Sequence, residues 1–354
     1  MTATRTVECP VPRPGTDVVL LGHGAGGRLS AELLDEVLLP ALNGADRPDP
    51  APLEDAAVLP ATGAAETVVS TDSFVVSPLF FPGGDIGSLA VHGTVNDIAM
   101  MGGMPTALAV SLILEEGLPL TVLERVARSL GQAARAAGVA VVTGDTKVVG
   151  RGAADQLFVT TTGFGRRLPT LRTSAAFAAP GDVVLLSGPI GLHGTTVMST
   201  REGLGFETDI GTDSRPLHHL VRAVGEAGGH DVHVLRDPTR GGLASALNEI
   251  ARDSAASVEI DEAAVPVPEP VAAACDLLGL DVLHVANEGC LVAFVAPGSA
   301  DAVLAAMRAD PAGRDAVAIG TVTGAPAGLV TLRTLVGARR VVDMLAGEQL
   351  PRIC

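Results

Sequence analysis

Four aspartates could hold a metal ion, because each stands among small or apolar residues close to the end of a predicted strand or helix. They are Asp55, Asp72, Asp97 and Asp145. A carboxylate in such surroundings costs free energy unless it is paired or bound to a cation. Magnesium prefers oxygen ligands and bridges carboxylates to substrate phosphates. A single aspartate of this kind is more often a helix cap or a turn residue, so the predicted magnesium site depends on all four converging in space.

Lys147 is the only lysine among the 24 basic residues of the chain, and it follows Asp145 by two positions. Lysine can lose its proton when it is partly buried, whereas arginine effectively cannot. A lone lysine in an arginine-rich chain therefore indicates a residue that neutralises phosphate or transfers a proton. The alternative is a routine surface ion pair with Asp145.

A glycine-rich segment with the sequence GHGAGG occupies residues 22–27, between a predicted strand and a predicted helix. It formally matches the dinucleotide-binding pattern, but the acidic residue expected about 20 positions later would fall in a loop. The pattern is therefore weak evidence for a dinucleotide site. The amides of such a loop could still close over phosphates, and a simple turn is an equal alternative.

The chain ends in Cys354, after a segment that is expected to pack loosely and in which Pro351 limits helix formation. Twelve extended residues reach at most about 40 Å, so this tail could carry a thiol between active sites. Arg352 is expected to favour the thiolate, which is the nucleophilic form. The other three cysteines show no metal-ligand spacing and are interpreted as reduced thiols. They are Cys9, Cys275 and Cys290, the last two expected to be buried.

Alternating strand and helix patterns predict an α/β or α+β protein with two domains. We expect a flexible segment at 1–17, the first domain at 18–168, the second at 169–340 and a mobile tail at 341–354. The first domain has predicted strands at 18–21, 67–71, 107–114, 139–142 and 156–163, helices near 30–42, 85–101 and 120–137, and a loop at 43–54. The second has predicted strands at 183–187, 282–286, 291–295, 316–323 and 329–341, and helices near 194–203, 216–227, 240–253 and 299–309.

Composition excludes several classes of protein. The net charge of −16 argues against nucleic-acid binding, which needs clustered basic residues. The chain has no run of about 18 apolar residues that could span a membrane, and its N-terminus lacks the apolar core of a secretion signal. We therefore expect a cytoplasmic enzyme that binds neither nucleic acid nor membrane.

Six motifs together resemble the HypE family of hydrogenase-maturation factors, from about residue 18 to the end. They are GHGAGG at 22–27, NDIAM at 96–100, TGDTKVV at 143–149, DPTRGGLA at 237–244, NEGC at 287–290 and PRIC at 351–354. The resemblance implies a two-domain PurM-like fold, with an N-terminal mixed-sheet ATP-binding domain and a C-terminal α/β domain. It also implies a homodimer joined through N-terminal strands, with the ATP sites near the interface.

The resemblance also implies roles for individual residues. ATP would be bound by Gly24, Gly26, Gly27, Asp72, Asn96, Asp97, Gly144, Asp145 and Thr146. Mg²⁺ would be held by Asp55, Asp72, Asp97 and Asp145, and the catalytic group would comprise Cys354, Lys147 and Glu288. Either Lys147 or Glu288 could be the proton acceptor. Asp237 and Arg240 are interpreted as a helix start that could also meet phosphate.

The implied activity is ATP-dependent dehydration of a carbamoyl group carried on Cys354. HypF would load the group, dehydration would leave a thiocyanate, and the cyanide would pass to iron held by the HypC–HypD complex. Two alternatives remain open from the residues alone. One is a small-molecule kinase or synthetase of the same superfamily, which would not need a terminal cysteine. The other is a non-catalytic carrier whose tail is gated by ATP.

Overall fold

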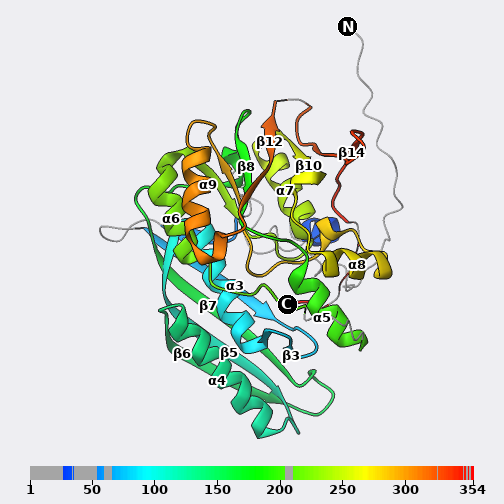
Figure 1. The fold of residues 1–354 in the computed structure, drawn as a ribbon. Helices are drawn as coiled ribbons and strands as arrows, with labels where there is room; N and C mark the ends of the chain where they lie inside the picture. Colours follow the sequence, from blue (N-terminus) through cyan, green and yellow to red (C-terminus); the bar gives the residue numbers. More distant parts are fainter. Residues whose placement is uncertain are drawn as a thin grey trace.

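The computed structural model describes residues 27–33, 35, 54–59, 66–203, 210–324, 326–345, 347, 350 and 352–354. Two β-sheets, each packed against helices, form the two halves of the molecule (Figure 1). The predicted strand at 18–21, residues 22–26 of the glycine-rich segment and Cys9 lie outside the described residues, as does nearly all of the predicted loop at 43–54. A short helix, α1 (Arg28–Leu33), follows the glycine-rich segment.

The first sheet has five strands in the order β1-β2-β7-β5-β6, and only the β5–β6 pair is parallel. The strands are β1 (Ala57–Leu59), β2 (Thr67–Phe74), β5 (Gly103–Glu115), β6 (Ala140–Val149) and β7 (Leu157–Arg167). Before α3, β3 (Phe80–Phe81) and β4 (Gly84–Asp85) form a small hairpin. The strand predicted at 139–142 is confirmed as the start of β6, which continues to Val149. The TGDTKVV motif therefore lies within β6 rather than in a turn after it.

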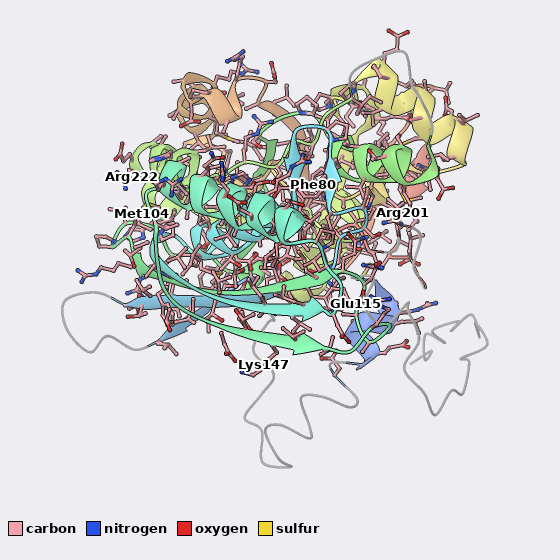
Figure 2. The ribbon with its side chains drawn as sticks, turned by 90° about the horizontal axis from the view of Figure 1, so that it is seen from below. Phe80, Met104, Glu115, Lys147, Arg201 and Arg222 are labelled. Carbon is pink, nitrogen blue, oxygen red and sulfur yellow. The ribbon has the colours of Figure 1, made fainter. Side chains whose placement is uncertain are left out.

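Two helices, α3 (Ile86–Met100) and α4 (Leu120–Ala136), cover one face of this sheet. The Asp85 carboxylate starts α3 by accepting hydrogen bonds from the backbone N–H groups of Gly87 and Ser88. α3 is buried almost all round because it packs against the first sheet on one side and the second half of the molecule on the other. The opposite face of the sheet, which carries Lys147, is covered by no helix among the described residues (Figure 2).

The second sheet has seven strands in the order β14-β13-β10-β12-β8-β11-β9, and only the β10–β13 pair is parallel. The strands are β8 (Val183–Leu186), β9 (Val232–Arg236), β10 (Ser257–Asp261), β11 (Val292–Val295), β12 (Val317–Thr323), β13 (Val330–Arg333) and β14 (Arg339–Val341). Two helices, α6 (His218–Gly228) and α9 (Ala300–Ala309), share one apolar core with this sheet, and α7 (Gly242–Ser254) packs in another. Two further helices of the described residues are α5 (Leu192–Glu202) and α8 (Glu269–Leu278).

Most predicted elements are confirmed, and the errors have local causes. The predicted strand at 282–286 is wrong: residues Val282–His284 form a 3₁₀ turn, which the Asp281 carboxylate starts by accepting from the backbone N–H of Leu283. The predicted strand at 329–341 is two strands, because the chain reverses between Thr334 and Ala338, with Gly337 at φ 81°. The sequence analysis did not predict β1, β3, β4, β9, β10 or α8.

The C-terminus lies near the middle of the molecule, beside α5 (Figure 1). The expectation of a loosely packed tail is wrong for its last residues, because Ile353 is 3% exposed and belongs to the apolar core under the first sheet. Leu350 packs against Val271, Cys275 and Val285 of the second half. The described end of the tail therefore bridges the two halves.

Candidate active site

The first half of the molecule contributes three carboxylates. Asp72 lies on β2, Asp97 lies on the last turn of α3, and Asp55 precedes β1. The Ser70 hydroxyl, two residues before Asp72, donates a 2.6 Å hydrogen bond to Asp97. Asp55 receives a 2.5 Å ion pair from Arg236 at the end of β9, which ties the two halves together. Strand β2 and helix α3 thus place Asp72 and Asp97 close together, as the sequence predicted.

The second half contributes Asp237, Arg240 and Glu288 from the loops at the ends of β9 and before β11. The Glu288 turn is held by Asp213, whose carboxylate accepts from the N–H groups of Glu288 and Gly289. A Cβ atom at Gly289 would lie 1.8 Å from the Asp213 carbonyl oxygen, so only glycine fits there. Sequence reasoning identified Glu288 but missed Asp213, since an aspartate in a Gly-Thr-Asp-Ser segment looks like an ordinary turn residue.

Burial dominates the electrostatics of this acidic cluster. It raises the pKa of Asp97 and that of Glu288 well above their usual values, and the neighbouring Asp237 charge raises both further. The pKa of Asp237 itself rises to about 8, first through burial and then through Asp55. Burial also raises the pKa of Asp72, while the positive charge of Arg240 opposes that change. Such a cluster either retains protons or gains from a bound cation.

The cluster provides oxygen ligands suited to magnesium. One carboxylate oxygen of Asp55 and one of Asp237 are buried and have no hydrogen-bond partner among the described residues. Within the same residues, no three acidic, histidine or cysteine side chains are arranged closely enough to hold a metal by themselves. Magnesium usually takes one or two carboxylates together with substrate phosphates and waters, so the donor set fits a metal that arrives with a nucleotide.

The tail brings Cys354 to this cluster. Burial raises the pKa of the Cys354 thiol to about 12; Arg240 lowers it, and the charges of Glu288, Asp72 and Asp97 raise it. The thiol and Arg240 are therefore neighbours of the predicted catalytic Glu288. The expectation that Arg352 would favour the thiolate is wrong, because its guanidinium donates instead to the Val75 carbonyl and to Asp155.

The structure does not bring the TGDTKVV residues to this cluster within one chain. Strand β6 lies three strands away from β2, and strand spacing makes that about 14 Å. Lys147 forms a 2.8 Å ion pair with Asp145 at the surface, with both side chains more than 60% exposed. The four metal ligands predicted from the sequence therefore do not converge in one chain, since Asp145 lies apart. Gly144 and Thr146 lie on the same exposed strand.

Two other predicted ATP-binding positions lie in contacts within the chain. The Asn96 amide donates to the carbonyl oxygens of Arg215 and Glu288, and its oxygen accepts from Leu217 N–H. Gly27 approaches the tail segment so closely that a Cβ would lie 2.4 Å from the Leu345 oxygen. Gly24 and Gly26 lie outside the described residues. The ATP-binding roles of these four residues remain predictions.

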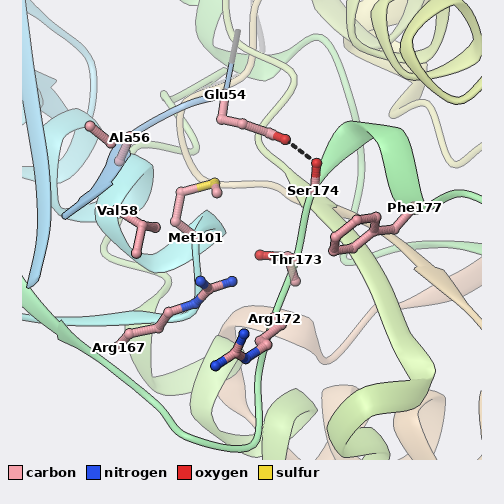
Figure 3. Close-up of a pocket in the computed structure, with 10 residues that line it drawn as sticks. Glu54, Ala56, Val58, Met101, Arg167, Arg172, Thr173, Ser174 and Phe177 are labelled. Carbon is pink, nitrogen blue, oxygen red and sulfur yellow. Dashed lines mark hydrogen bonds between the residues drawn. The ribbon is translucent and has the colours of Figure 1, made fainter. Parts of the chain in front are cut away.

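A pocket of about 530 Å³ lies beyond the C-terminal end of α3, one turn after Asp97, and none of the predicted site residues lines it. Arg167 and Arg172 extend toward it, and Glu54 accepts a hydrogen bond from Ser174 at its edge (Figure 3). Arg167 is already paired with Glu66. The pocket therefore does not belong to the carboxylate and thiol cluster.

Comparison with known proteins assigns the class. Residues 53–167 match the N-terminal domain of the AIR synthase related proteins and residues 179–332 match their C-terminal domain. The chain belongs to this class, with the predicted two-domain PurM-like fold of mixed sheets.

Within that class the chain belongs to the HypE family. It is 54% identical over 335 residues to the carbamoyl dehydratase HypE of Azotobacter vinelandii, covering 94% of this chain and 96% of the relative. A HypE crystal structure in complex with ATP is similar at TM-score 0.79 and 49% identity, covering 95% of this chain and all of that one. The HypE of a HypE–HypF complex is similar at TM-score 0.82 and 44% identity, covering 88% and 99%.

The described residues include no helix that is long and apolar enough to cross a membrane.

Proposed function

We propose that this chain is a carbamoyl dehydratase that uses ATP to convert an S-carbamoyl group on its own Cys354 into a thiocyanate. The observation that carries the proposal is the terminal thiol lying beside Arg240, Glu288, Asp72 and Asp97. A relative with 54% identity is a carbamoyl dehydratase, and a similar HypE structure holds ATP. A kinase acting on a free small molecule would not need its own C-terminus in this cluster.

The chemistry requires two steps with defined leaving groups. The carbamoyl oxygen attacks the terminal phosphorus of ATP, ADP leaves, and the nitrogen loses one proton. The carbon–oxygen bond then breaks, phosphate leaves with the electron pair, the nitrogen loses its second proton, and the sulfur carries a nitrile. Magnesium, when bound, would screen the phosphate charges. Asp72 and Asp97 would hold it. Arg240 orients the phosphorylated oxygen beside the sulfur. Glu288 accepts the first proton of the nitrogen, and the departing phosphate takes the second.

A homodimer would place Lys147 and Asp145 in a second copy's site. The uncovered sheet face carries hydroxyl groups and the apolar side chains of Ile113 and Phe164, which are 39% and 40% exposed. Pairing of two such faces would bury these side chains and bring β6 of one copy toward the other copy's nucleotide. Gly144, Asp145, Thr146 and Lys147 would then contact ATP in trans.

The partners follow from the same proposal. A HypE relative forms a complex with HypF, so HypF is the proposed carbamoyl donor. The HypC–HypD complex, which would hold the iron, is the proposed acceptor of the cyanide.

Mass spectrometry of the C-terminal peptide tests the function. After incubation with the carbamoyl donor enzyme, Cys354 should carry a carbamoyl group, and ATP with magnesium should convert it to a cyano group. The Glu288→Gln variant should accept the carbamoyl group but dehydrate it about 10²–10⁴-fold more slowly, the usual contribution of an acid or base. Retention of the carbamoyl group by the unchanged protein in the presence of ATP and magnesium would contradict the proposal.

A further inference from the structure

The last three residues of the tail lie beside residues 75–77 in the opposite direction. Val75 N–H donates a 3.0 Å hydrogen bond to the main-chain oxygen of Cys354, and Ser77 N–H donates a 3.2 Å bond to that of Arg352. Ile353, between them, points into the core under the first sheet. This pairing fixes the direction of the tail but involves only one edge of it.

Helix α5 provides further hydrogen bonds to the tail. Arg201 donates a 2.8 Å hydrogen bond to the carbonyl oxygen of Arg352 and two bonds, of 2.6 and 2.9 Å, to that of Ser77. His193, two turns earlier on α5, forms a 2.9 Å hydrogen bond with the carbonyl oxygen of Ile353. A carbonyl oxygen can only accept, so His193 Nε2 carries the proton. Arg201 lies on the opposite side of the first sheet from Lys147 (Figure 2).

From these contacts we infer that Arg201 and His193 are positioning residues that clamp the terminal segment by its backbone and keep the Cys354 sulfur at the acidic cluster. The role of these two residues in dehydration rests on the proposed function. Among the described residues, the hydrogen bonds from Arg201 and His193 to the tail go to main-chain oxygens. The clamp therefore holds the tail equally well whether the sulfur is free, carbamoylated or cyanated.

The same clamp is connected to the turn that carries Glu288. His193 Nδ1 lies 2.7 Å from the Thr212 hydroxyl, and Nδ1 must be the acceptor because Nε2 carries the proton. Asp213, the next residue, holds the Glu288 and Gly289 amides. One loop thus contacts both the residue that grips the tail and the residue proposed to take the protons. Burial, which lowers the pKa of His193 below its usual value, keeps that imidazole neutral.

Alkylation of the full-length protein tests the clamp without ATP or a carbamoyl donor. Iodoacetamide is added at one pH, and the rate at Cys354 is followed by the mass of the C-terminal peptide. Arg201→Gln should raise this rate roughly tenfold, since it removes charge-assisted hydrogen bonds to the tail. Arg201→Lys, which keeps the charge but not the fork of donors, should give an intermediate rate. Arg222→Gln, an exposed arginine on α6, is the matched control and should leave the rate unchanged.

Buried Cys290 distinguishes release of the tail from unfolding, whereas Cys275 lies in the cluster against which Leu350 of the tail packs. Faster alkylation of Cys354 with no change at Cys290 supports the clamp. An unchanged rate in Arg201→Gln, or an equal increase at Cys354 and Cys290, overturns it. If the glutamine variant does not fold, the lysine variant decides by the same criteria.

A kinetic measurement separates positioning from general damage. With carbamoylated protein, Arg201→Gln should lower the single-turnover rate constant of dehydration at saturating ATP, because Arg201 contacts the tail rather than the carboxylates. The ATP concentration that gives half of the maximal rate should be unchanged. Equal losses in the rate constant and in nucleotide affinity would contradict the positioning role. If no dehydration occurs even in the unchanged protein, the proposed function fails. The alkylation experiment still tests whether Arg201 holds the tail, because it does not depend on dehydration.

Discussion

At the scale of single residues, the site depends on acidic groups that are kept away from water. Asp237, Asp97 and Glu288 come from different elements, yet each has its pKa raised mainly by burial. A neutral thiol fits this setting, because a thiolate would add negative charge to the cluster. Arg240 offsets part of that charge beside the thiol, as Arg236 does beside Asp55 and Asp237, and this gives a reason for an arginine just before α7.

Asp237 makes stability depend on pH. Its pKa is about 8 in the folded protein and near the ordinary 3.8 when unfolded. A carboxyl group with a raised folded pKa stabilises the fold fully below about pH 4, and this contribution is lost as the pH rises through 8. The Tm of the protein without nucleotide should therefore fall between pH 5 and pH 9 more steeply than that of Asp237→Asn. Parallel Tm curves for the two proteins, measured by calorimetry, would contradict the assignment.

At the scale of elements, α3 is the centre of the site. Its capping residue Asp85 fixes where it begins, and Asn96 and Asp97 on its last turns face the second half of the molecule. The flanking sheet offers β2 to the site and leaves β6 exposed. One element of the sheet therefore serves the site of its own chain, while another is available to a second copy.

The exposed sheet face predicts self-association. Ile113→Glu places a charge among side chains that pairing would bury, so the protein should become monomeric while its Tm changes little. Sedimentation velocity measures this change. Leu335→Glu is the matched control, because Leu335 is 74% exposed at the turn between β13 and β14. Equal oligomeric states of the two variants would show that this face is not the interface.

At the scale of the whole molecule, the packing of α3 against the second half, a few polar contacts and the tail join the two halves. Asp55 and Arg236 are 11% and 8% exposed at their side chains, so their ion pair is nearly dry. The Asn96 amide adds hydrogen bonds to the backbone at Arg215 and Glu288. The tail adds Leu350 on one side and Ile353 on the other.

Removal of one partner from the buried pair should be costly. Asp55→Ala removes the 2.5 Å partner and leaves the Arg236 charge buried, with Glu249 at 3.9 Å as a more distant ion-pair contact. Loss of one partner of a buried pair typically lowers the free energy of unfolding by about 3–5 kcal/mol. Urea unfolding measures the loss, and Asp145→Ala, at an exposed pair, is the control that should change it by less than about 1 kcal/mol. A loss in Asp55→Ala as small as in the control would show that the pair does not join the halves.

The sequence alone determined the family, the two-domain class and most elements, because these depend on motifs and on periodic apolar positions that are local in the chain. It also identified Asp72, Asp97, Glu288 and Cys354, which the structure brings together in one cluster. Only the tertiary structure decided which of the predicted ligands meet. The separation of Asp145 and Lys147 from the other carboxylates follows from strand order, and strand order is set by packing between distant segments rather than by spacing. The tail shows this most clearly. Its few apolar residues did not predict burial, because its position depends on hydrogen bonds from Arg201 and His193 of α5 to its backbone.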